Sequence, residues 1–359
     1  MKVYIENLRP GFINIYNGKS KFIATLAEYL YSNGCKILDR PWGCEVNLRM
    51  NSLPSYDVGV KFTRLDDIFY CDDPIHRNIY KKGFKKIKYS LRHSDGIIYQ
   101  SKIAKGIIEN ILKIKPKSSK IIYNGIKCDR ELEEWEISIP NDYKIITFAC
   151  QKLFPLRRLK EFLIVWKEIN KHFPKVALAL VFSKKESFIP SNLKDAKNVY
   201  FFDCMPPSKL NFLLKKSLFL VSIKYQDSCP NIVSEAAHLG IPTLVSNTNG
   251  WVECQELINR NYILPCNLDN FCTIDKVDFE SPHFFNFVEL EKLLLKLLNE
   301  KNKVELNKIP NVLKIEYTCQ RYMDYFREVL DYKNFQNNYN FPRQIIHSKR
   351  IINKIKGLV

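Results

Sequence analysis

The sequence lacks the features that would place the chain in a membrane, in a secretory pathway or among zinc proteins. No stretch reaches the roughly 18 uninterrupted apolar residues of a membrane-spanning helix, and the N-terminus carries only a short apolar piece. The 11 cysteines include no Cys-x-x-Cys pair and no Cys/His cluster at zinc-like spacing, and their odd number does not favour a disulfide framework. We therefore expect a cytoplasmic protein with reduced thiols.

Acidic residues are also scarce relative to basic ones. The chain has 56 Lys and Arg against 38 Asp and Glu, a net charge of +18, which favours nucleic acid, anionic lipid or a phosphorylated small molecule as partner. It contains no RNA-binding fingerprint, zinc-finger spacing or recognition-helix pattern, so we do not expect nucleic acid. With 359 residues, 46% of them hydrophobic, it can form two domains with separate cores.

Short β-branched or aromatic runs alternate with helical patterns along most of the chain, which predicts α/β domains with parallel sheets covered by helices on both faces. The expected strands are Lys2–Ile5, Tyr56–Phe62, Gly96–Tyr99 and Lys120–Tyr123 in the first half, and Lys144–Ala149, Val176–Phe182, Val199–Phe202, Leu218–Ile223 and Pro242–Ser246 in the second. Ligands of such sheets bind at the carboxyl ends of the strands, so we expect the active site in the cleft between the domains.

An acidic pair marks the most informative segment of the second half. Asp227 and Glu235 lie eight positions apart, on either side of a predicted helix start near Pro230. The backbone N–H groups of Asn231, Ile232 and Val233 would then face the crevice, where they could hold an anion. The alternative is that Asp227 only initiates the helix and Glu235 is a solvated helix position.

Two further segments carry candidate phosphate-binding groups. Lys152 and Arg157 flank a basic loop that follows a buried strand, although a solvated basic loop is the alternative. Gly18 precedes the first predicted helix, and a helix N-terminus after glycine is suited to anions. The spacing of Gly11 and Gly18 does not match a P-loop, which argues against an ATPase or kinase.

Together these segments resemble the retaining nucleotide-sugar glycosyltransferases of family 4, most clearly from about Asp95 to Glu256. The resemblance implies that Asp227 contacts hydroxyls of the donor sugar, that Glu235 accepts hydrogen bonds from the ribose diol, and that Lys152 and Arg157 bind the diphosphate. The family more often has Glu where this chain has Asp227. Gln151 and Arg158 replace glycines of the family pattern.

Weaker parts of the resemblance add further candidates. The segment 199–210 resembles the strand and loop on which the nucleotide base rests, which implies base contacts at Cys204 and Met205. The segment 64–70 resembles an Arg-Leu-Asp element that would bring Arg64 and Asp66 to the cleft rim, with Asp66 among the catalytic residues.

The resemblance implies a GT-B fold, with two Rossmann-like parallel-sheet domains facing each other across a cleft. After the second domain we expect a C-terminal helix that could return to the N-terminal domain, followed by a polar Asn-rich link and a basic tail. The predicted parts are an N-terminal acceptor-side domain over 1–127, a linker over 128–143, a nucleotide-sugar-binding domain over 144–315, the helix over 316–332 and an amphipathic tail over 333–359.

The implied activity is transfer of a sugar, with retention of configuration, from a UDP- or GDP-linked donor to a hydroxyl of a glycan, glycolipid or polysaccharide precursor. Asp66–Asp67 and Asp72–Asp73 could suggest the metal-binding pair of the other major glycosyltransferase fold, but that fold does not explain 227–250. We therefore expect no metal and no cofactor. A catalytically inactive GT-B-like protein that binds a nucleotide or glycan is the alternative.

The tail over 343–359 places isoleucines on one helical arc and Lys and Arg on the other, which favours peripheral attachment to the cytoplasmic face of an anionic membrane, where lipid-linked acceptors reside. A disordered tail, or one docked on the core, is the alternative.

Overall fold

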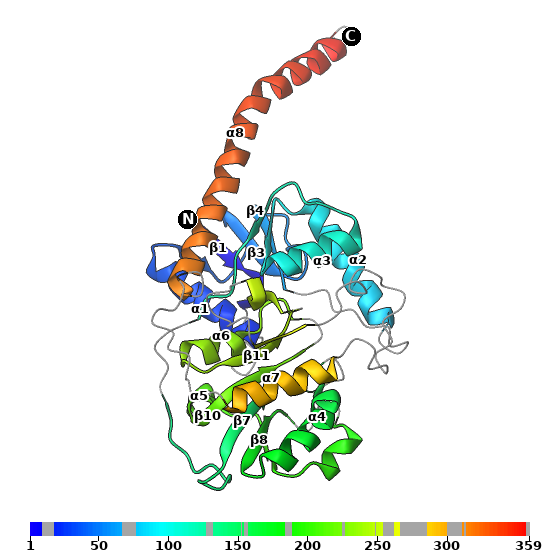
Figure 1. Ribbon diagram of the computed structural model, residues 1–359. Helices are drawn as coiled ribbons and strands as arrows, with labels where there is room; N and C mark the ends of the chain where they lie inside the picture. The colour runs from blue at the N-terminus through cyan, green and yellow to red at the C-terminus, as the bar shows by residue number, and fades with distance from the viewer. Residues whose placement is uncertain are drawn as a thin grey trace.

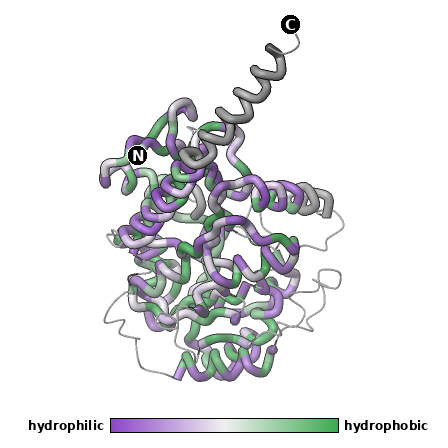
Figure 2. The backbone as a smooth tube through the Cα atoms, turned by 90° about the horizontal axis from the view of Figure 1, so that it is seen from above, coloured by the Kyte–Doolittle hydropathy of each residue, from purple (hydrophilic) through white to green (hydrophobic). Residues whose placement is uncertain are grey.

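The computed structural model describes residues 1–8, 18–66, 77–126, 132–151, 153, 157–183, 189–224, 227–247, 249–253, 262–265, 286–299, 311 and 314–356. These residues form two domains, one above the other in Figure 1, with β1, β3 and β4 in the upper and β7, β8 and β10 in the lower domain. Along the helices, hydrophilic and hydrophobic positions alternate (Figure 2), as expected for helices that cover sheets.

The N-terminal domain is built on a parallel six-stranded sheet of order β2-β1-β3-β4-β5-β6. Its elements are β1 (Lys2–Ile5), α1 (Gly18–Ser32), β2 (Lys36–Leu38), β3 (Val46–Met50), β4 (Val60–Leu65), α2 (Arg77–His93), β5 (Gly96–Tyr99), α3 (Lys102–Leu112) and β6 (Ser119–Ile121), with a short 3-10 helix η1 (Glu6–Leu8). Helices α2 and α3 cover one face of this sheet, where Ile87, Leu91 and Ile108 are buried.

The C-terminal domain has a second parallel six-stranded sheet, of order β12-β11-β10-β7-β8-β9. Its elements are β7 (Lys144–Ala149), α4 (Leu159–His172), β8 (Val176–Val181), β9 (Val199–Phe202), α5 (Pro207–Lys216), β10 (Ser217–Ser222), α6 (Asn231–His238), β11 (Thr243–Ser246), β12 (Ile263–Leu264) and α7 (Phe287–Asn299), with the 3-10 helices η4 (Ser191–Asp195) and η5 (Gly250–Glu253). Helices α4 and α7 bury one face and α5 and α6 the other. The predicted two-domain α/β fold is confirmed.

The last helix, α8 (Ile315–Lys356), packs on the N-terminal domain. Ile315, Tyr322 and Phe326 share a buried cluster with residues of α1, β1, β3 and β4. At the start of α8, Gly125 lies against Ile315, because a Cβ at Gly125 would come within 2.5 Å of the Ile315 Cα. The sequence predicted a helix that ends at Tyr332 and an Asn-rich link after it, but α8 continues to Lys356 without a break and extends away from the two domains (Figure 1).

The helix continues because asparagine only weakens helix propensity, by well under 1 kcal/mol per residue, and a helix already held by packing over its first turns propagates through such positions.

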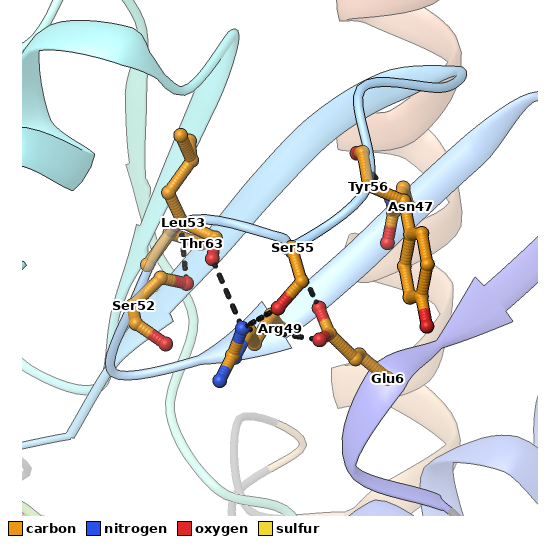
Figure 3. A network of polar contacts seen from close by, with 8 residues as sticks. All are labelled: Glu6, Asn47, Arg49, Ser52, Leu53, Ser55, Tyr56 and Thr63. Carbon is orange, nitrogen blue, oxygen red and sulfur yellow. Dashed lines mark hydrogen bonds and ion pairs between the residues drawn. The ribbon is translucent and has the colours of Figure 1, made fainter.

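The loop between β3 and β4 is held by a polar network, shown in Figure 3. Arg49 forms an ion pair of 3.0 Å with Glu6 and also donates a hydrogen bond to the Ser55 hydroxyl, while the Ser55 N–H donates to the second Glu6 oxygen at 2.8 Å. Thr63 donates to the Ser52 carbonyl at 3.2 Å. These contacts fix the carboxyl end of β3.

The two domains meet at the segment 249–253. Both carboxylate oxygens of Glu253 accept backbone N–H groups at the start of α3, from Lys102 at 2.9 Å and Ile103 at 2.5 Å, and one of them also accepts the Tyr123 hydroxyl. Trp251 stacks on Tyr123, with ring centroids 5.9 Å apart. This segment thus joins the C-terminal domain to the first turn of α3.

Candidate active site

A cavity of about 250 Å³ opens at the carboxyl ends of β7 and β8, against the first turns of α6. It is lined by Ala149, Cys150, Gln151, Arg157, Val181, Cys204, Met205, Pro207, Leu210, Asp227, Pro230, Asn231, Ile232 and Glu235. In a parallel sheet this edge is where ligands bind.

Asp227 contributes a carboxylate paired with two cations. Its Oδ2 lies 3.3 Å from Lys224 Nζ and 3.5 Å from Arg157 Nη1. Its backbone carbonyl accepts the Gly250 N–H at 2.8 Å, and Gly250 packs so closely that a Cβ there would lie 1.7 Å from the Ser228 carbonyl oxygen. Asp227 is therefore held both by its backbone and by its side chain.

Lys224 was missed by the sequence analysis. It lies two residues beyond β10, and its side chain is only 4% exposed. A lysine directly after a buried strand is the signal that could have identified it, since a buried ammonium requires an anionic partner.

Helix α6 begins at Asn231, directly after Pro230, as the sequence predicted. Asn231, Ile232 and Glu235 line the cavity, with Glu235 one turn along the helix. Val233 does not belong to the site: its N–H donates to the Pro230 carbonyl at 3.1 Å and its side chain is buried beside Cys229 and Trp251. Of the three N–H groups that the sequence analysis assigned to an anion, that of Val233 is therefore used within the first turn of α6.

Arg157 reaches the cavity from the loop before α4. Its neighbour Arg158 adopts a left-handed backbone conformation, with φ 59° and ψ 30°. This is the conformation that glycine favours, so the backbone at Arg158 has a glycine-type conformation although its side chain is arginine. Lys152 lies outside the described residues.

Cys204 and Met205, which follow β9, also line the cavity. The Cys204 N–H donates to the Asp203 carboxylate at 2.8 Å, and its Sγ lies 3.5 Å from the Gln151 carbonyl. Burial raises the pKa of the Cys204 thiol and raises that of Cys150 to about 11. Both side chains are therefore neutral thiols near pH 7, which does not favour a role as nucleophile.

Asp66 lies in the N-terminal domain, directly after β4, and is absent from the cavity wall. It pairs with Arg64 at 3.1 Å and accepts hydrogen bonds from Asn51 at 3.2 Å and from Gln100. Arg64 was expected at the cleft rim, but it is only 1% exposed, because its guanidinium stacks on Phe22 at 4.0 Å beneath α1.

A polar link connects this N-terminal cluster to the cavity. Arg64 Nη2 donates to Asn124 Oδ1 at 2.7 Å, and Asn124 Nδ2 donates to Asn231 Oδ1 at 3.0 Å across the domain interface. The structure thus brings together Arg157, Asp227, Glu235, Asn231, Ile232, Cys204 and Met205, and joins Asp66 to them indirectly. Gly18 is the first residue of α1, and residues 9–17 before it lie outside the described part.

Within the described residues, no three His, Cys, Asp or Glu side chains are grouped so that they could hold a metal ion.

No protein-family model matches the chain, and no curated protein matches it significantly. Solved structures do resemble it. Sucrose-phosphate synthase from Thermosynechococcus elongatus has a TM-score of 0.67 at 10% identity, over 92% of this chain and 99% of that one. WaaG, a glycosyltransferase involved in lipopolysaccharide biosynthesis, has a TM-score of 0.56 at 12% identity, over 96% of this chain and 98% of WaaG.

The trehalose-6-phosphate synthase OtsA has a TM-score of 0.50 at 9% identity, over 86% of this chain and 76% of that one. At these identities the likeness concerns the arrangement of the two domains across almost the whole chain. That arrangement is the GT-B fold.

Proposed function

We propose that this chain, which has the GT-B fold, is a retaining glycosyltransferase that moves a sugar from a nucleotide-diphosphate sugar to a hydroxyl acceptor. The observation that carries the proposal is the convergence of Arg157, Asp227 and Glu235 on one cavity at the carboxyl ends of the C-terminal strands. The sequence interval between the two carboxylates resembles the family 4 signature, and their common cavity is the place where that signature would act.

In this proposal the cavity binds a UDP- or GDP-linked sugar without a metal. Glu235 accepts the ribose hydroxyls, since a carboxylate has two oxygens for a diol. Asp227 contacts hydroxyls of the donor sugar, and its two cationic partners hold the carboxylate in place. Cys204 and Met205 form the wall for the base.

Arg157, together with Lys152 and the start of α6, would bind the diphosphate. The bond between the anomeric carbon and the phosphate oxygen breaks as the bond to the acceptor oxygen forms, and the acceptor proton passes to the departing phosphate oxygen. Negative charge therefore grows on the diphosphate, and cations placed beforehand stabilise the transition state more than the ground state.

The acceptor side of the proposed site is the N-terminal domain, where Asp66 lies after β4 among Asn51, Gln100 and Arg64. One structural neighbour is named as a glycosyltransferase of lipopolysaccharide biosynthesis, which agrees with a glycan or lipid-linked acceptor.

An anionic membrane surface is the second partner we propose, for a cytoplasmic protein attached peripherally. The residues 77–120 contain 13 Lys and Arg against two Asp and Glu, and α2 and α3 cover one face of the sheet. On α2, Lys85, Lys88 and Arg92 are exposed. Such a basic face would attract anionic lipid headgroups in addition to the tail over 343–359. None of the described helices is long and apolar enough to span a membrane.

The test is a screen of the purified chain against common UDP- and GDP-sugars, with release of the nucleoside diphosphate as the measured quantity. We expect slow hydrolysis of one donor, acceleration by a glycan or glycolipid acceptor, and a product whose anomeric configuration by NMR equals that of the donor. An inverted product would refute the retaining mechanism. Nucleotide binding without turnover of any donor would favour an inactive binding protein instead.

A further inference from the structure

The short helix η5 lies between the N-terminal domain and the loop that carries Asp227. Its first residue, Gly250, donates its N–H to the Asp227 carbonyl at 2.8 Å. A Cβ at Gly250 would lie 1.7 Å from the Ser228 carbonyl oxygen and 2.9 Å from the Ser101 hydroxyl of the N-terminal domain. This position therefore has no room for a side chain, and both domains pack directly against the backbone of η5.

Trp251 connects the same short helix to the other end of that loop. Its side chain is fully buried, and its indole N–H donates to the Pro230 carbonyl at 2.8 Å, directly before α6. Its ring stacks on Tyr123 of the N-terminal domain, with the ring centroids 5.9 Å apart and the ring planes at 25°. The loop from Asp227 to Pro230 is therefore supported by η5 at both ends, and η5 in turn packs on the N-terminal domain.

Glu253, at the end of η5, supplies a charged contact between the domains. Its carboxylate oxygens accept the N–H groups of Lys102 and Ile103, the first two residues of α3, while the Ala104 N–H donates to the Ser101 hydroxyl at 3.0 Å. These N–H groups have no acceptor within their own helix, and the helix dipole favours a negative charge beside them. The first turn of α3 contains no acidic residue, so Glu253 provides this charge from the other domain.

This contact exists only while the domains are together. If they separate, the N–H groups of α3 exchange Glu253 for water, and η5 loses its contacts with Ser101 and Tyr123. Relative motion is the default expectation for two domains of one chain, and hydrogen bonds to a charged acceptor are the strong ones that can oppose it. Glu253 is not among the residues that line the donor cavity. It can therefore influence a reaction there only through the loop that η5 supports.

We propose that Glu253 is a positioning residue that holds the two domains together and thereby places Asp227 against the donor sugar. The inference rests on the proposed function, because it assumes that Asp227 contacts the sugar of a bound donor. It separates two properties of the site. Groups of the C-terminal domain alone hold the nucleotide, whereas turnover also depends on a contact with the N-terminal domain.

The first test is Glu253→Ala in the full-length protein. Turnover at saturating donor should fall at least about tenfold, as for loss of a hydrogen bond to a charged group. The affinity for UDP or GDP in calorimetric titration should not change. The radius of gyration in small-angle X-ray scattering should increase, because molecules with separated domains become more populated. Glu253→Gln keeps one acceptor oxygen, so it should lose less turnover than Glu253→Ala.

Lys102→Pro removes the same contact from the other side and leaves Glu253 in place. Proline suits the first position of a helix, and Ser101 before it is already extended, with φ −158° and ψ 167°. The proline ring takes the place of the N–H hydrogen, so the Glu253 carboxylate must move away. We expect lower turnover with unchanged nucleotide affinity. Lys102→Ala keeps the N–H at this exposed position and is the matched control, with wild-type turnover expected.

The double variant Glu253→Ala/Lys102→Pro shows whether the two changes act on one contact. With no carboxylate to displace, the proline should cause no further loss. A loss from Lys102→Pro that persists in the Glu253→Ala background would refute the inference, as would wild-type turnover in a folded Glu253→Ala. An equal fall in nucleotide affinity would also contradict it, because the C-terminal site itself would then be damaged. Failure of the wild-type chain to turn over any donor would overturn the proposed function, and the inference with it.

Discussion

The ammonium of Lys224 lies 3.3 Å from the carboxylate of Asp227, three positions along the chain, and the two side chains are 4% and 12% exposed. Arg157 approaches the same carboxylate oxygen at 3.5 Å. Asp227 is thus the shared anion between a nearly buried lysine and an arginine at the cavity wall. A carboxylate held in this way has a fixed direction, which contact with a sugar hydroxyl requires.

Lys224→Met tests this buried pair. We expect a loss of about 1–3 kcal/mol in the free energy of unfolding, because Asp227 loses its better shielded partner but keeps Arg157. The measurement is chemical denaturation of the variant beside Lys171→Met, which removes a cation from an exposed pair with Glu168 and should cost less than about 0.5 kcal/mol. The double variant Lys224→Met/Asp227→Asn should lose less stability in total than the sum of the losses in the two single variants. Additive losses would show that the two side chains are not coupled.

Arg157→Ala tests the diphosphate contact. If this cation stabilises growing negative charge, turnover of bound donor should fall by about two to three orders of magnitude, as for loss of a preorganised charge-stabilising donor. The melting temperature should barely change. Arg157→Lys should recover only part of the activity, since an ammonium cannot form a planar bidentate contact with phosphate.

The matched control is Lys160→Ala, an exposed cation three residues further along. It should leave the release of nucleotide unchanged. The sequence predicts a similar loss for Lys152→Ala. Wild-type turnover in both Lys152→Ala and Arg157→Ala would exclude the basic loop from the site.

Glu235→Gln tests the ribose contact. The substitution keeps the size but removes the charge, so we expect donor affinity to fall by about 1.5–3 kcal/mol, measured by calorimetry with UDP or GDP. Glu168→Gln, at an exposed position on α4, is the control and should bind as the wild type does. Asp227→Asn should have the opposite pattern: UDP or GDP still binds, but turnover falls and the preference among donors changes. Unaltered nucleotide affinity in a folded Glu235→Gln would remove Glu235 from the site.

Vesicle flotation tests the membrane proposal. The full chain should float with anionic vesicles more than with neutral ones, and deletion of 343–359 should reduce this binding. Replacing Lys85, Lys88 and Arg92 by Gln should reduce it further, at about 1 kcal/mol for each cation near the surface. Equal partitioning of the full-length and tail-deleted proteins would exclude the tail, and an unchanged triple variant would exclude α2.

Lys113→Gly tests backbone strain at the end of α3. Lys113 is exposed and has φ 52° and ψ 38°, a left-handed conformation that costs a non-glycine residue about 1 kcal/mol or more. Glycine relieves this strain, whereas alanine keeps it. We therefore expect Lys113→Gly to be more stable than Lys113→Ala by about 1 kcal/mol in chemical denaturation. Equal stability of the two variants would contradict the assignment of strain to this position.

The sequence predicts the C-terminal sheet well because its strands are continuous apolar runs. Lys144–Ala149 and Val199–Phe202 have the predicted bounds. In the N-terminal half, β3 was missed, because Asn47 and Arg49 interrupt its apolar positions. In the fold, Asn47 donates to the Tyr56 carbonyl and Arg49 pairs with Glu6, and neither partner is visible from local sequence.

Likewise, local sequence predicts part of the candidate site but not the contact between the domains. The interval between Asp227 and Glu235 predicts one cavity because a loop and the helix after it are local structure. The contact between Asn124 and Asn231 joins residues 107 positions apart, from different domains. Only the arrangement of the two domains brings these residues together. Periodicity and motif spacing therefore cannot predict this contact.

The contribution of α8 to the N-terminal core has a consequence for synthesis of the chain. The cluster around β1, β3 and β4 includes Ile315, Tyr322, Phe326 and Val329, so its last members emerge from the ribosome after the whole C-terminal sheet. The first domain to be translated is therefore the last to be completed. A fragment cut at the domain boundary would expose the apolar side of α1 and the sheet, and an independently folding N-terminal half needs α8 supplied again, by fusion or by circular permutation.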